Sequence, residues 1–186
     1  MKELKQKLKK KSKEWLIDRL VELSMANDAN ANRMELSLAV DVADSQDFVD
    51  LFKRQIDEAT EEISDHGPGS WTSQLPTAGF DSVVDTLAEI LPKNLQAVME
   101  ISEYALMQLD TVFELQDECE LEYLVDEFRD LHLKACGKLK PDPVALGSRL
   151  AMLNRQTEWG FFDGPPGGYS KVLGKEGMAA FLSTKS

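Results

Sequence analysis

Apolar residues recur three and four positions apart along most of the chain, which is the pattern of helices that bury one side. The first such segment opens at Ser12 and ends near residues 27–30, and its apolar residues predict one buried face: Trp15, Leu16, Leu20, Val21 and Leu23. A second helix is predicted over 32–43, and a third begins after Ser45, which is a favourable N-cap residue. We expect these three helices to pack together.

The second half of the chain repeats this pattern with shorter connections. Helices are predicted over 80–91, 95–117 and 120–136, with Gly137 expected as the left-handed cap of the third. Asp142 followed by Pro143 predicts the N-cap and first position of a helix over 143–154. Because short connections place successive helices antiparallel, we predict an all-α fold, either an irregular helical bundle or a short solenoid of antiparallel helical hairpins.

Two regions interrupt the helical pattern. The stretch 65–79 contains five glycines and prolines and predicts a long loop, which is either functional or a spacer pinned by buried Trp71 and Leu75. The last thirty residues mix aromatic residues with glycine and proline, which predicts a packed irregular cap that ends in a helical turn or two over 176–183. We therefore expect a basic arm at 1–11 and one all-helical domain at 12–186.

Composition and charge narrow the class of protein. Hydrophobic residues make up 42% of the 186 residues and charged residues 29%, as in a soluble globular domain. No stretch is long and apolar enough to predict a membrane-spanning helix, and the early lysines are followed by acidic residues where a secretory signal would be apolar. Cys119 and Cys136 lie about 25 Å apart in one predicted helix, which is too far for a disulfide. These features favour a cytoplasmic protein with no integral membrane association.

The positive charge is concentrated at the start of the chain. Residues 1–13 carry seven lysines and one acidic residue, a charge of +6, whereas the remainder carries −18. The candidate nucleic-acid-binding residues are Lys5, Lys7, Lys9, Lys10, Lys11 and Lys13. Three alternatives to nucleic-acid binding stay open for the arm. It is a frayed helix that aids solubility, a helix docked on the acidic remainder of the chain, or a contact for a protein or lipid partner.

Candidate catalytic and metal-binding groups are scarce. His132 and Cys136 are four residues apart, so they share a helical face and would supply two zinc ligands if an acidic residue completed the site. A buried histidine that is hydrogen-bonded to a neighbour is the commoner arrangement, and His66 lies in the glycine-rich loop. The acidic runs are typical of solvated helix faces, and residues 164–168 lack the lysine and hydroxyl of a phosphate-binding loop. We therefore expect neither an enzyme nor a bound cofactor.

Several stretches together resemble a bacterial helical family of unknown function, found in some proteins that also carry a SWIM-type zinc finger. The resemblance spans about residues 12–182 and rests on Trp15–Leu20, Ile56–Thr60, Leu131–Cys136, Lys140–Pro143, Trp159, Phe162, Tyr169 and Val172–Ala179. It implies an all-helical, repeat-like fold and supplies no catalytic residues. The chain lacks the Cys-x-Cys and Cys-x-His pattern of the zinc finger itself.

The sequence therefore favours a non-enzymatic protein–protein interaction module. Its expected binding surface is a groove between hairpins or the loop around Trp71 and Leu75. The alternative is a nucleic-acid-associated accessory protein that uses the lysine-rich arm. The identity of the partner and the oligomeric state stay open.

Overall fold

The computed structural model describes residues 6–25, 31, 34–36, 38, 46–65, 75–113, 118–160 and 168–185. These ranges contain helices and no strand, so the predicted all-α fold is confirmed. The helices are α2 (Lys13–Met25), α4 (Gln46–Asp65), α5 (Ala78–Ile90), α6 (Leu95–Phe113), α7 (Glu118–Leu139), α8 (Pro143–Gln156) and α9 (Tyr169–Lys185).

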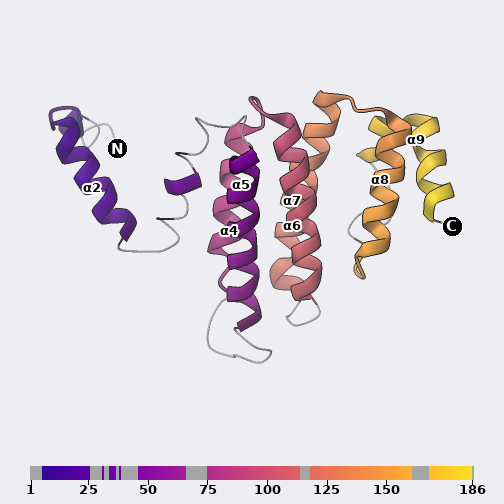
Figure 1. Cartoon of the computed structure of the whole chain (residues 1–186), viewed down its shortest axis with the longest axis horizontal. Coiled ribbons are helices and arrows are strands. Elements are labelled where there is room, and N and C mark those ends of the chain that lie inside the picture. The colour runs from indigo at the N-terminus through magenta and orange to yellow at the C-terminus, as the bar shows by residue number, and fades with distance from the viewer. Residues whose placement is uncertain are drawn as a thin grey trace.

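Three parts follow one another along the longest axis of the molecule (Figure 1). Helices α4 to α7 form a bundle in which α6 packs against both α4 and α7, and α5 packs against α4 and α7. Helices α8 and α9 form a hairpin at one end and pack most extensively against each other. At the other end, α2 stands apart from the bundle.

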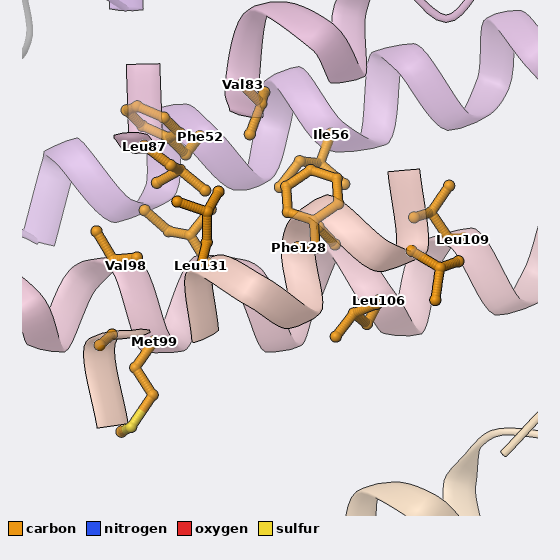
Figure 2. Packing of buried hydrophobic residues seen from close by; sticks show 14 of the residues in the cluster. Phe52, Ile56, Val83, Leu87, Val98, Met99, Leu106, Leu109, Phe128 and Leu131 are labelled. Carbon is orange, nitrogen blue, oxygen red and sulfur yellow. The ribbon is translucent and has the colours of Figure 1, made fainter. Parts of the chain in front are cut away.

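The hydrophobic core runs through the centre of the bundle (Figure 2). Phe80 of α5 meets Phe128 of α7 edge to face, with ring centroids 6.1 Å apart, which is a favourable geometry for aromatic pairs. Each of the four helices contributes fully buried apolar side chains, among them Phe52, Ile56, Val83, Leu87, Leu106, Leu109 and Phe128. The spacing of apolar residues in the sequence therefore identified the core faces of α4 to α7 correctly.

The C-terminal hairpin depends on close backbone contact. A Cβ atom at Gly147 of α8 would lie 2.1 Å from the carbonyl oxygen of Gly177 in α9, and one at Gly177 would lie 2.5 Å from the carbonyl oxygen of Pro143. No side chain fits at such distances, so glycine at these two positions lets the helices approach. Gly174 takes a left-handed φ of 58° and kinks α9.

Some helix ends lie where the sequence predicted them, and others do not. The Asp142 carboxylate accepts a hydrogen bond of 2.8 Å from the backbone N–H of Ala145, so the predicted N-cap of α8 is confirmed. The predicted cap at Gly137 is wrong, because α7 continues through it to Leu139 and Lys140 takes the left-handed conformation instead, with φ 53°. The helix predicted over 176–183 is present as the part of α9 that follows the kink at Gly174, and a further helical segment from Tyr169 precedes the kink.

Helix α2 forms where predicted, but its apolar face is not buried. Leu20 is 53% exposed and Leu23 is 61% exposed, and Ile17 and Val21 are also exposed. The prediction that this face packs against the next two helices is therefore wrong for α2. Most of the second predicted helix, 32–43, lies outside the described residues, although Leu36 is fully buried in the core.

Candidate functional site

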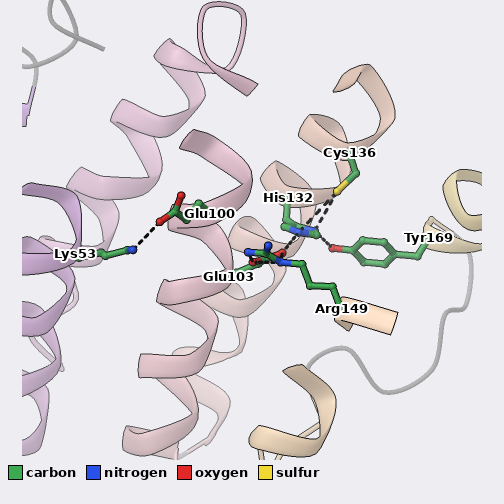
Figure 3. A network of polar contacts seen from close by, with 7 residues as sticks. All are labelled: Lys53, Glu100, Glu103, His132, Cys136, Arg149 and Tyr169. Carbon is green, nitrogen blue, oxygen red and sulfur yellow. Dashed lines mark hydrogen bonds and ion pairs between the residues drawn. The ribbon is translucent and has the colours of Figure 1, made fainter. Parts of the chain in front are cut away.

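A buried polar cluster joins four helices at the boundary between the bundle and the hairpin (Figure 3). Its members come from α6 (Glu103), α7 (His132 and Cys136), α8 (Arg149) and α9 (Tyr169). All except Arg149 are buried, and the Arg149 side chain is about half exposed. The cluster therefore reaches the surface through the guanidinium.

Glu103 is the acceptor at the centre of the cluster. Arg149 Nε donates to both carboxylate oxygens at 2.8 Å, and Arg149 Nη2 also contacts Glu103 Oε2. His132 Nε2 lies 3.1 Å from Glu103 Oε1. Burial raises the pKa of Glu103, but the hydrogen bonds from His132 and Arg149 and the electrostatic attraction of the Arg149 guanidinium outweigh it, and the pKa falls below its ordinary value. Glu103 is therefore a carboxylate at neutral pH.

The carboxylate fixes the direction of its hydrogen bond with His132. Because an ionised carboxylate only accepts, Nε2 of His132 must carry the proton that it donates to Glu103. The other ring nitrogen, Nδ1, is hydrogen-bonded to Tyr169 Oη across 2.5 Å. Burial raises the pKa of Tyr169, which keeps its hydroxyl protonated. Both ring nitrogens of His132 are thus used within the protein.

Cys136 completes the cluster as a neutral thiol. Its Sγ lies 3.7 Å from each ring nitrogen of His132, and burial followed by the charge of Glu103 raises the pKa of the thiol to about 12. Because the thiolate is the form that attacks electrophiles and binds zinc, this cysteine is a poor nucleophile and a poor metal ligand. In the part of the chain that the structure describes, no three His, Cys, Asp or Glu side chains are arranged to hold a metal ion.

The other predicted site residues are scattered. Trp71, His66 and Lys5 lie outside the described residues. Leu75 is half-buried and packs against the core. The lysines of the arm that the structure describes are exposed: Lys7, Lys9, Lys10, Lys11 and Lys13.

The structure adds two surface features that the sequence did not reveal as sites. The first is the apolar face of α2, where Leu16, Leu20 and Leu23 follow one another at spacings of four and three residues. The second is a cavity of about 250 Å³ beside Trp159, near the C-terminal end of α6 and the start of α7. The spacing in α2 is visible in the sequence, but it is compatible with burial and exposure alike. The cavity has no sequence signal because its walls come from distant segments.

Comparisons with protein-family models, with curated proteins and with solved structures give no match to this chain. The resemblance to the bacterial helical family therefore stays a prediction. No helix in the described ranges is long and apolar enough to cross a bilayer.

Proposed function

We propose that this protein is a non-enzymatic protein–protein interaction module that binds its partner through the apolar face of α2. The observation that carries the proposal is the exposure of that face, defined here as Leu16, Ile17, Leu20, Val21 and Leu23. Leu16 is partly exposed, and the other four are exposed. A helix that lays such a face into an apolar groove is a recurrent mode of recognition.

The contrast with the bundle supports this interpretation. In α4, the apolar positions Phe52, Ile56 and Ile63 are completely buried, whereas the equivalent side of α2 faces solvent. Burying a leucine side chain is worth about 1.5–3 kcal/mol, so covering two or three of these residues would supply a large driving force for association. Contiguous exposed apolar surface of this kind marks interaction sites in soluble proteins.

The buried cluster supports the non-enzymatic part of the proposal. A general base needs an accessible atom within reach of a substrate, and both nitrogens of His132 are hydrogen-bonded inside the protein. Cys136 is fully buried as a neutral thiol. We assign this cluster to fixing the hairpin on the bundle.

The test compares two full-length variants in partner capture from the native cell lysate. The double variant Leu16→Gln/Leu20→Gln makes the apolar face polar, and Glu22→Gln places the same residue on the polar side of α2 as a control. Because all three side chains are at least partly exposed, both variants should keep the melting temperature of the wild type. The proposal expects the double variant to lose captured protein at least tenfold and Glu22→Gln to retain it; equal capture by both would refute it.

Nucleic-acid association through the arm is the second candidate, and the exposure of Lys9, Lys10 and Lys13 is the observation in its favour. Acidic residues follow at once in α2, including Glu14 and Asp18, which reduces the attraction for phosphate. If the arm binds nucleic acid, removal of residues 1–11 abolishes binding, and affinity falls steeply as salt rises. Binding that ignores salt concentration would exclude this candidate.

A further inference from the structure

The cavity beside Trp159 is an aromatic groove with an acidic rim. Its apolar lining is Phe113, Val125 and Trp159, of which Trp159 is the exposed one, and its rim carries Glu122, Asp126 and Arg129. At about 250 Å³ it is too small for a whole helix, which is about 10 Å across, but it accommodates side chains that project from one. Trp159 is 40% exposed, so one wall of the groove is open to an approaching partner.

Hydrogen bonds to a buried carboxylate hold the Trp159 backbone in place. The buried carboxylate of Asp110 in α6 accepts from the backbone N–H groups of Glu158 at 2.9 Å and Trp159 at 3.0 Å. The Trp159 ring packs against Phe113, with centroids 5.7 Å apart. The aromatic wall is therefore preorganised, which lowers the entropy cost of binding.

The charge of the rim favours a cationic partner. Arg129 Nη1 lies 3.7 Å from Asp126 Oδ1, so the single guanidinium of the rim is already compensated. No described cation forms an ion pair with Glu122, and Glu158 beside Trp159 is exposed. A lysine next to apolar side chains would meet both the carboxylate and the aromatic wall.

Helix α2 presents this combination of side chains. Lys13, Leu16 and Leu20 are separated by three and four residues, so one stripe of the helix begins with an ammonium and continues with two leucines. The exposed Lys9, Lys10 and Lys11 precede it and extend the positive charge. Residues 1–13 carry a charge of +6 and the remainder of the chain carries −18, so the arm of one copy is attracted to the acidic part of another.

We propose that α2 of one copy of this chain docks in the groove around Trp159 of a second copy, with Leu16 and Leu20 against the aromatic wall and Lys13 toward Glu122. The proposal rests on the proposed function of α2 as a protein-binding helix and names its partner. Because the helix and the groove are different surfaces, the contact is heterologous, so each copy keeps one free helix and one free groove. Such a contact extends beyond a dimer unless its rotation closes a ring.

The first measurement is the molar mass of the full-length protein in solution as its concentration rises. The wild type should grow beyond two chains or close into a ring, and the association should weaken at high salt because the exposed charges are screened. Two variants should each self-associate at least tenfold more weakly than the wild type: the helix variant Leu16→Gln/Leu20→Gln and the groove variant Glu122→Lys/Asp126→Lys. All four positions are at least partly exposed, so both variants should fold.

Mixing the two variants gives the decisive result. The groove variant still has an intact helix, and the helix variant still has an intact groove, so an equimolar mixture should form a heterodimer and stop at two chains. A matched control, Glu127→Lys/Asp130→Lys, reverses two exposed α7 charges that do not line the cavity and should leave self-association unchanged.

Three outcomes would overturn the proposal. The first is a wild type that stays monomeric at every concentration. The second is a groove variant that associates as strongly as the wild type, and the third is a mixture of the two variants that contains only monomers. If α2 still required Leu16 and Leu20 to capture a lysate protein in those cases, the proposed function would stand and only its partner would be wrong. If neither capture nor self-association depended on these leucines, both proposals would fail.

Discussion

The carboxylate of Glu103 in α6 receives the guanidinium of Arg149 in α8 across the boundary between the bundle and the C-terminal hairpin. His132 adds a second donor from α7, and Tyr169 continues the chain of hydrogen bonds into α9. One buried carboxylate therefore connects the elements of the bundle to both helices of the hairpin.

Removing the charge of Glu103 should destabilise the protein. In Glu103→Gln the amide NH₂ group faces donors, and charge-assisted hydrogen bonds are lost, so we expect a loss of about 2–3 kcal/mol in urea unfolding. Glu100→Gln is the matched control, because Glu100 pairs with Lys53 at 2.7 Å where both side chains are about one-third exposed, and it should cost less than about 1 kcal/mol. Equal losses in the two variants would show that the cluster contributes no more than a surface ion pair.

The same group predicts the acid dependence of stability. Since the folded protein lowers the pKa of Glu103 below its ordinary value of 4.5, its stabilisation is complete above that pH and is lost as pH falls through the folded-state pKa. The difference in unfolding free energy between the wild type and Glu103→Gln should therefore shrink below about pH 4.5. A difference that stayed constant between pH 7 and about 3 would contradict an ionised Glu103 in the folded state.

Two glycine substitutions should have opposite signs. Gly147→Ala forces α8 away from the carbonyl oxygen of Gly177 and should cost about 1–3 kcal/mol. Gly137→Ala lies in the last turn of α7, where an added Cβ atom would have no heavy atom within 4 Å, and should stabilise by about 0.5–1 kcal/mol. Thermal unfolding measures both effects. A destabilised Gly137→Ala would mean that this glycine is a left-handed cap after all.

Cys136 should be protected from alkylation in the folded protein. Its side chain is fully buried and its thiol has a pKa of about 12, so little thiolate is present or accessible at neutral pH. In a Cys119→Ser background, iodoacetamide should modify Cys136 orders of magnitude more slowly than in denaturant, as followed by mass spectrometry. Comparable rates in the two conditions would place this thiol outside the core.

The sequence predicted the fold where local chemistry decides the structure. Apolar spacing located α4 to α8, and Asp142 with Pro143 defined the start of α8, because a capping side chain and a fixed φ act within a few residues. It failed at Gly137, because α7 runs through this glycine to Leu139 and Lys140 takes the left-handed conformation. Glycine is tolerated both within a helix and at its left-handed cap, so the residue type alone does not locate the helix end.

The candidate sites were less predictable, because their partners are distant in the sequence. His132 and Cys136 were recognised as one helical face, but Glu103, Arg149 and Tyr169 come from other helices. The stripe of α2 was visible as a pattern, yet periodicity defines which side is apolar and not whether another element covers it. The groove at Trp159 needed the three-dimensional arrangement of α6, α7 and the segment after α8.

The most direct test of the central claim places a photo-crosslinking residue at position 20 of the full-length protein in its native cells, with position 22 as the polar-face control. We predict a crosslinked protein from position 20, identified by mass spectrometry, and little or none from position 22. The adduct should disappear when Leu16 is also changed to Gln. Equal crosslinking from the two positions, or none from position 20, would contradict a protein-binding role for the apolar face of α2.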